Sequence, residues 1–217
     1  MPEPGGEISP PAEVTNALET KPCFIFLNHG NWLTANNLSM GDGRLFSASW
    51  AMVPNRIDDL ISGDAHWRPD RVDDKRHCGA ISPFGASQIS HGGWRLQLEM
   101  DAERIRAESF PNCPSRLAGL FVFPDLPTCH QVHNTHGWDL GQVAEMRYVA
   151  LREAALDMEI VSMANRLYAT NSFSSEAANR LWSTYWSGGV ISDLGITPAS
   201  QSIQELLIDG VVRPIVT

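Results

Sequence analysis

Three residues before a predicted strand carry the first sign of chemistry in this sequence. Pro114, Ser115 and Arg116 stand directly ahead of a run of apolar residues. Proline fixes the backbone torsion φ, serine supplies a hydroxyl, and arginine presents five N–H donors in a planar fork. The combination indicates either an anchor for an anionic group or a well-made turn. In the second interpretation, Arg116 pairs with Glu103 or Glu108 of the preceding segment.

A group of histidines and one cysteine raises the question of a metal site. Four potential ligands fall close together in the sequence: Cys129, His130, His133 and His136. Zinc binds such side chains, and a helix would place some of them on one face. However, Pro127, Asn134 and Gly137 are expected to interrupt a helix here, and the spacing matches no zinc pattern. We therefore predict polar loop histidines and no metal.

Cysteine chemistry finds little support. The four cysteines, at positions 23, 78, 113 and 129, include no CxxC pair, so reduced thiols are expected. Cys113 has no evident base near it in the sequence, and no GxSxG motif occurs. The sequence thus does not predict a hydrolase with a covalent intermediate.

Composition limits the class of protein. The chain has 217 residues, 43% of them hydrophobic, and a net charge of −9. That charge disfavours a protein that coats nucleic acid. No window approaches the ~20 apolar residues of a membrane span, and the N-terminal residues do not resemble a signal peptide. A cytoplasmic location is expected, with secretion that needs no cleaved signal left open.

The predicted elements suggest one domain that follows a tail. We expect residues 1–22 to form a disordered or extended tail, residues 23–217 to form a single domain, and residues 54–93 to form a long loop. Strands are expected near 24–28 and 117–123 and around 147–151. Helices are expected at 101–110, capped by Asp101, at 157–168, and from Ser174 to Gly188. Residues 202–217 predict a hairpin that turns at Asp209-Gly210. The mixture, without a βαβ rhythm, predicts an α+β fold with mostly antiparallel sheets.

Several short motifs, taken in order, resemble the ADP-ribosyltransferase-fold domains of bacteria and phages. The match is to a little-characterised branch with the block "E..R...FP..PSR....F.F", which corresponds here to Glu103, Arg106 and "FPNCPSRLAGLFVF". It continues with "LDM" at 156–158, "YWSG" at 185–188 and "QELLIDGVV" near the end. The resemblance implies two small, mostly antiparallel sheets that form an NAD cleft between flanking helices.

The resemblance also implies roles for individual residues. Glu205 corresponds to the catalytic glutamate of the family, which stabilises the oxocarbenium-like transition state and orients the attacking group. Taken alone, a glutamate at a strand start would be interpreted as solvated. Ser115 is expected to hydrogen-bond a ribose or the carboxamide of nicotinamide, and Arg116 to pair with the pyrophosphate. Tyr185 and Trp186 are candidates for stacking on nicotinamide, although core packing is the more common use of such side chains.

The first predicted strand departs from the family pattern. The expected nucleotide-binding residues are Phe26, Leu27, Asn28, His29 and Gly30. The family normally has His or Arg where this chain has Phe26. Either His29 or Asn28 replaces that donor, or Arg116 does, or NAD+ binds without efficient turnover.

These inferences predict a mono-ADP-ribosyltransferase of a toxin-like or conflict-system type. NAD+ would be its substrate, and the acceptor would be a protein or a nucleic acid. An antitoxin or immunity protein is a further expected partner, and no membrane partner is expected. The alternatives are an NAD glycohydrolase and a non-catalytic module that binds a nucleotide or, through the 54–93 loop, a protein.

Overall fold

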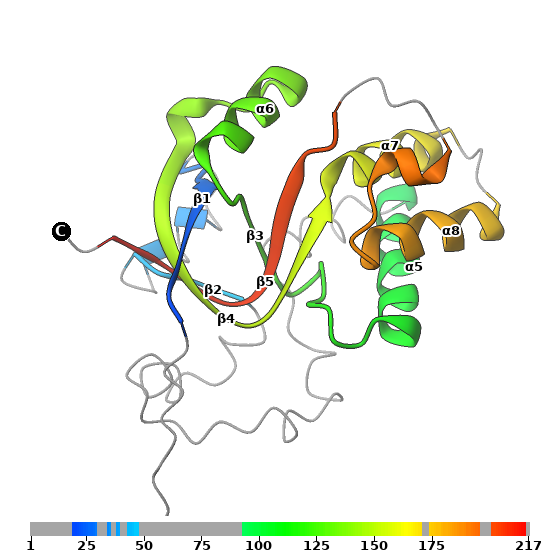
Figure 1. Ribbon diagram of the computed structural model, residues 1–217, viewed down its shortest axis with the longest axis horizontal. Coiled ribbons are helices and arrows are strands. Elements are labelled where there is room, and N and C mark those ends of the chain that lie inside the picture. Colours follow the sequence, from blue (N-terminus) through cyan, green and yellow to red (C-terminus); the bar gives the residue numbers. More distant parts are fainter. Residues whose placement is uncertain are drawn as a thin grey trace, which may run out of the picture.

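The computed structural model describes residues 19–29, 34–35, 38–39, 43–47, 93–170, 174–195 and 201–215. Within these ranges, one five-stranded antiparallel sheet combines with four α-helices and two short 3-10 helices (Figure 1). The predicted α+β class with antiparallel strands is therefore confirmed. The first strand begins at Lys21, two residues before the expected domain boundary. Gly30, most of the expected tail and nearly all of the expected 54–93 loop lie outside the described residues.

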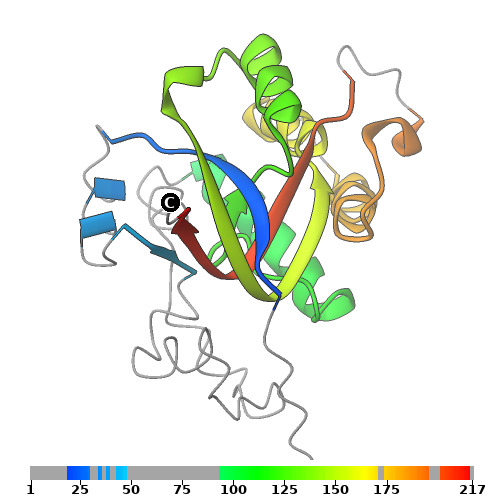
Figure 2. The same ribbon diagram turned by 60° about the vertical axis from the view of Figure 1, so that its left-hand side comes forward.

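The sheet is continuous and strongly curved. Its strands are β1 (Lys21–Phe26), β2 (Leu45–Phe46), β3 (Leu120–Val122), β4 (Val143–Asp157) and β5 (Gln204–Pro214). Their order is β1-β4-β5-β2, and β3 pairs with another stretch of β5. Two hydrogen bonds between Phe24 and Phe123, of 2.9 and 2.7 Å, join β1 to the residue after β3. The edges of the sheet thus meet (Figure 2), and the described residues form one sheet where the sequence predicts two.

The predicted hairpin at the C-terminal end is wrong. Asp209 and Gly210 lie inside β5, which pairs with β4 along most of its length. A side chain at Gly210 would lie 2.0 Å from the carbonyl oxygen of Val149, so this glycine permits a close approach of two strands. Asp209 accepts hydrogen bonds from Ser47 (2.8 Å) and Arg152 (2.8 Å) beside a register shift in β4. A dipeptide typical of turns is here part of a tightly packed ladder.

The helices begin and end at recognisable caps. They are α5 (Gly93–Ser109), α6 (Leu126–His136), α7 (Met158–Ala169) and α8 (Ser175–Trp186), and the 3-10 helices are η3 (Leu140–Gln142) and η4 (Ile191–Leu194). Ser174 caps α8 as predicted, because its hydroxyl accepts from the N–H of Ala177. Helix α5 begins eight residues earlier than predicted, and Asp101 accepts from Tyr168 (2.8 Å) where a cap was expected.

Helix α6 corrects another expectation. Pro127 lies in its first turn, where no intrahelical N–H bond is lost, and Asp125 caps that turn through Thr128. Gly137 ends the helix in the left-handed conformation, with φ at 71°. Of the three residues expected to interrupt a helix, Pro127 and Gly137 therefore mark its two ends, and Asn134 lies within it.

Three apolar clusters hold these elements together. Helices α5, α7 and α8 lie side by side beyond one end of the long β4–β5 pair (Figure 1) and bury Trp182 and Tyr185 between them. A second cluster, around Cys23 and Ile208, lies within the curved sheet, and a third joins α6 to it through Phe123 and Cys129. Because the sheet links both ends, side chains from the helix group and from α6 can face one cavity.

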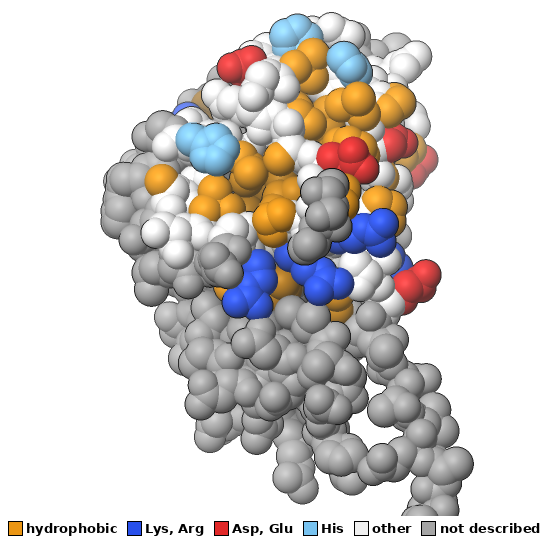
Figure 3. Space-filling model, turned by 90° about the vertical axis from the view of Figure 1, so that its left-hand side faces the viewer, with side chains coloured by type: hydrophobic (Ala, Val, Ile, Leu, Met, Phe, Trp, Pro, Cys, Tyr) orange, Lys and Arg blue, Asp and Glu red, His pale blue; other side chains and the backbone are white. Residues whose placement is uncertain are grey.

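The surface is not uniformly acidic despite the net charge of −9. Figure 3 shows a face on which hydrophobic side chains gather, with Lys and Arg toward one margin and histidines toward the other. Among the described residues, no helix combines the length and apolar character that crossing a membrane requires.

Candidate functional site

The described residues enclose a pocket of about 420 Å³, a volume typical of ligand sites. One end is polar and lies beside α5 and the start of β5. The other end lies beside α6 and is mostly aromatic. The side chains and backbone that line it come from Ile25, Phe26, Leu27, Thr34, Leu45, Phe46, Glu99, Arg116, Gly119, Leu120, Phe121, Phe123, His136, Trp138, Met158, Val161, Ser162, Asn165 and Glu205.

Three buried side chains, Glu99, Arg116 and Glu205, line the polar end of the pocket, and the hydroxyl of Tyr185 bonds to two of them from behind. Arg116 binds Glu99 through two N–H donors, with N···O distances of 3.1 and 3.3 Å. Another of its donors reaches the Tyr185 hydroxyl at 2.5 Å and Oε1 of Glu205 at 3.4 Å. Tyr185 in turn donates to the same Glu205 oxygen over 2.9 Å. The guanidinium therefore joins α5, α8 and β5.

The pKa values of this cluster are set mainly by burial. Burial raises the pKa of Glu205, and Arg116 and the Tyr185 hydroxyl only partly offset this effect. Burial also raises the pKa of Tyr185 well above its ordinary value, so the phenol stays protonated and can donate. Burial opposes the charge of Arg116, but Glu99, Tyr185 and Glu205 together raise the pKa of Arg116. The site thus holds a permanent cation beside a carboxyl group with an elevated pKa, as catalytic sites often do.

The turn at Pro114–Arg116 explains how Arg116 enters this cluster. The N–H groups of Ala118 and Gly119 both bond to the carbonyl of Ser115, at 3.2 and 2.7 Å, and reverse the chain before β3. A side chain at Gly119 would lie 2.7 Å from the side chain of Leu207, so β5 packs directly on this turn. The turn directs Arg116 inward, where only 4% of it is exposed.

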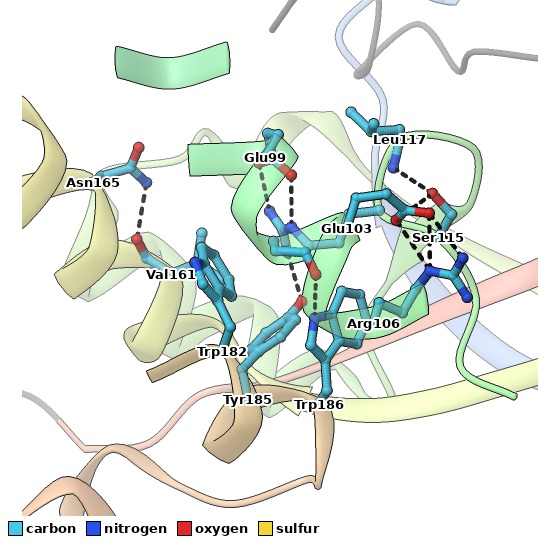
Figure 4. A network of polar contacts seen from close by, with 12 residues as sticks. Glu99, Glu103, Arg106, Ser115, Leu117, Val161, Asn165, Trp182, Tyr185 and Trp186 are labelled. Carbon is cyan, nitrogen blue, oxygen red and sulfur yellow. Dashed lines mark hydrogen bonds and ion pairs between the residues drawn. The ribbon is translucent and has the colours of Figure 1, made fainter. Parts of the chain in front are cut away.

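Ser115 belongs to a different network. Its hydroxyl donates to Glu103 over 2.9 Å, and Arg106 binds the same carboxylate at 2.8 Å (Figure 4). None of these three residues lines the pocket. Arg116 therefore does not pair with Glu103 or Glu108, and that prediction is wrong. Arg116 does anchor α5, but through Glu99.

The residues of the first strand separate into two groups. Phe26 and Leu27 line the pocket, whereas Asn28 and His29 are exposed and do not. Phe26 packs edge-on against Phe123, with ring centroids 5.6 Å apart. Neither Asn28 nor His29 therefore lies in the pocket, where it could replace the His or Arg donor of the family.

Tyr185 and Trp186 are not positioned for stacking on a ligand. Both are buried in the cluster between α5, α7 and α8, and neither lines the pocket. The indole N–H of Trp186 donates to the carbonyl of Ala102 over 2.8 Å. Tyr185 contributes to the site by hydrogen bonds from its hydroxyl, and Trp186 packs in the apolar core.

Several residues that line the pocket were not predicted from the sequence. Glu99 is the main partner of Arg116, and its signal in the sequence is an acidic residue among the apolar residues that α5 buries. His136 also lines the pocket, and its Nε2 lies 2.6 Å from Oε1 of Glu159. Trp138 follows it, 44% exposed. Their signal, a Gly between a His and a Trp at a helix end, is too common to indicate a site.

The described cysteines and histidines do not come together in a metal site. Cys129 is buried in an apolar cluster, and burial raises its pKa to about 11. His130 and His133 are exposed, and among the described residues no three side chains of metal-ligand type come together. Burial raises the pKa of Cys113 despite the nearby Arg106 and Arg152, which disfavours a reactive thiolate.

Comparison with known proteins adds no assignment. No protein-family model matches the chain, and no curated protein matches it.

Proposed function

We propose that this chain is an NAD+-dependent mono-ADP-ribosyltransferase with an ADP-ribosyltransferase-like fold. It would cleave the bond between nicotinamide and ribose and transfer ADP-ribose to a protein or nucleic-acid acceptor. The observation that carries the proposal is the position of Glu205. This carboxyl group is buried at the start of the last described strand, lines the pocket and is held by Tyr185 and Arg116.

The geometry suits a reaction in which positive charge develops on a sugar. As the bond to nicotinamide breaks, the ribose ring gains oxocarbenium character, and a carboxylate close to it stabilises that charge. Because Glu205 is only 7% exposed, such an interaction is stronger than in solution. The Tyr185 hydroxyl and Arg116 would fix the orientation of Glu205, and Glu99 would fix Arg116.

A specific observation favours a second candidate, a module that binds a nucleotide without turning it over. Phe26 stands where the family has a His or Arg donor, and neither Asn28 nor His29 lines the pocket. In addition, one oxygen of Glu205 already accepts from Tyr185 and Arg116, which leaves the other oxygen for a ribose hydroxyl. Hydrolysis of NAD+ by water is a variant of the first proposal and requires the same glutamate.

Release of nicotinamide from NAD+ tests the proposal. Wild type and Glu205→Gln are compared with and without cell lysate as a source of acceptors. The matched control is Glu103→Gln, which alters a neighbouring glutamate that binds Arg106 outside the pocket. Release that needs Glu205, is unaffected by Glu103→Gln and grows with lysate supports a transferase. Release without lysate supports a glycohydrolase. Binding of NAD+ without release supports the second candidate.

The biological setting belongs to the proposal as well. For a toxin-like or conflict-system enzyme, an antitoxin or immunity protein that covers the pocket would be a natural partner. Such a partner would compete with NAD+, so a protein that binds this chain and suppresses nicotinamide release would identify it.

A further inference from the structure

The end of the pocket beside α6 is built from three aromatic rings. Phe26, Phe123 and Trp138 contact one another edge to face, with centroids 5.1 to 6.2 Å apart and interplanar angles between 82° and 89°. The two phenylalanines hold the indole of Trp138, which remains 44% exposed and lines the pocket. A large exposed indole fixed in this way offers a flat apolar surface to a ligand.

A histidine beside this surface is oriented by a buried carboxylate. Nε2 of His136 lies 2.6 Å from Oε1 of Glu159, and the two side chains are 21% and 3% exposed. A carboxylate only accepts hydrogen bonds, so Nε2 carries the proton in this contact. In a neutral imidazole the other nitrogen, Nδ1, therefore has a lone pair and accepts. The neutral pair presents an acceptor of defined position to a part of the pocket wall that also includes the polar side chains of Ser162 and Asn165.

The backbone keeps His136 and Trp138 in place. Gly137 lies between them in the left-handed conformation and ends α6, with its N–H bonded to the carbonyl of His133. Glu159 lies in the first turn of α7, where its own N–H donates to Asp157 over 3.0 Å. The end of one helix and the start of another thus fix the two members of the His–Glu pair.

We propose that this end of the pocket binds a planar heteroaromatic ring that carries an amino or amide N–H group. The ring would stack on Trp138, and its N–H would donate to Nδ1 of His136. An aliphatic ligand would leave the oriented imidazole without a partner, and a phosphate would meet a lone pair backed by the Glu159 carboxylate. In expecting the ring to belong to NAD+, the inference rests on the proposed function.

NAD+ has two rings of this kind, the adenine with its amino group and the nicotinamide with its carboxamide. Calorimetric titrations with AMP and with nicotinamide identify which of them binds. Two further ligands serve as matched probes, because purine riboside 5′-monophosphate has a hydrogen in place of the amino group and nicotinic acid has a carboxylate in place of the amide. We expect the probe that lacks the N–H to bind at least about fivefold more weakly, as for the loss of one hydrogen bond.

Substitutions of pocket residues test where the ring binds. Trp138→Leu and His136→Ala should each weaken binding at least about fivefold, the lower limit for the loss of a base-stacking contact. His130→Ala is the control, because His130 lies exposed on the same helix and does not line the pocket. A test without substitution uses nitrogen-15 spectra of the imidazoles. The His136 signals should report a proton on Nε2, and the ligand should shift them while those of His130 stay unchanged.

The outcomes separate this inference from the proposed function. Binding that depends on Trp138 and His136, without any cleavage of NAD+, would support the ring site and exclude the transferase. Cleavage of NAD+ that is insensitive to both substitutions, together with unshifted His136 signals, would overturn the ring site and leave the transferase. If NAD+, AMP and nicotinamide all fail to bind, the ring site is wrong.

Discussion

Tyr185 donates a hydrogen bond to Glu205 over 2.9 Å, although 20 residues and the whole of η4 separate them in the sequence. Both side chains are buried, and Arg116 contacts both. The hydroxyl therefore serves two neighbours at once, since it accepts from the guanidinium and donates to the carboxyl group. The phenol thus links the helix cluster to the pocket together with Arg116, so its removal should affect stability and ionisation together.

Tyr185→Phe should raise the pKa of Glu205 further. The hydrogen bond from Tyr185 favours the ionised carboxylate, and burial, together with the nearby charge of Glu99, outweighs it. The variant should also lose about 1–3 kcal/mol of unfolding free energy, because a buried arginine donor is left with fewer acceptors. Carbon-13 NMR titration of the Glu205 carboxyl measures the first effect and urea unfolding the second. An unchanged or lowered carboxyl pKa would contradict the geometry described for this pair.

The elevated pKa of Glu205 predicts a pH-dependent difference between wild type and Glu205→Gln. Between the ordinary glutamate pKa of about 4.3 and the raised value in the folded state, the folded protein binds more protons than the unfolded chain. The contribution of Glu205 to stability therefore falls as pH rises through this window. Glu205→Gln, which cannot ionise, should gain stability relative to wild type from pH 4 to pH 8. Urea unfolding across this range checks the sign, and a constant difference would rule it out.

Arg116→Ala should lower the free energy of unfolding by about 3–5 kcal/mol, as for other buried ion pairs that lose one partner. The substitution leaves Glu99 and Glu205 buried without their cation. In a Glu99→Gln background the same substitution should cost less, and a double-mutant cycle measures the coupling. Arg106→Ala is the control, because the Arg106–Glu103 pair is more exposed and should contribute about 1 kcal/mol. Equal losses for both arginines would argue against the central role of Arg116.

Gly210→Ala should destabilise the sheet by about 3 kcal/mol, toward the upper end for overpacked sites. The new carbon would lie 2.0 Å from the Val149 carbonyl, and that oxygen belongs to the backbone of a paired strand. Gly141→Ala is the matched control, because its nearest contact is the flexible side chain of Asp139 at 3.2 Å. Thermal unfolding of the two variants compares them directly. Similar melting temperatures would mean that β4 and β5 do not approach so closely.

Local signals predicted much of the fold. The Ser174 cap and the glycine after α8 delimit that helix because capping acts within a single turn. The dipeptide Asp209-Gly210 led to the wrong prediction of a turn, because its role depends on contacts with residues that are distant in the sequence. The close carbonyl of Val149 demands a glycine there, and Ser47 and Arg152 bind the aspartate from distant parts of the chain.

The candidate site was predictable only in part. The resemblance named Glu205 and Arg116, and the structure places them 3.4 Å apart across 89 residues of sequence. Residues such as His136 were not predictable, because their role depends on α6 ending against the start of α7. Sequence spacing carries no information on that contact. The histidines of α6 were considered together as metal ligands, although the helix directs them to different environments.

Phe26→His tests whether the departure in the first strand limits activity. Position 26 lines the pocket, and the family that the sequence resembles has a His or Arg donor there. If the proposed function holds, a restored donor should raise nicotinamide release by about 5- to 10-fold, the effect of one added hydrogen bond. Phe26→Leu is the control for the aromatic contacts with Phe123 and Trp138, which both variants weaken. Higher turnover in the histidine variant alone would show that Phe26 limits an existing enzyme. Equal turnover in wild type and Phe26→His would mean that another pocket residue, with Arg116 the first candidate, already supplies the donor.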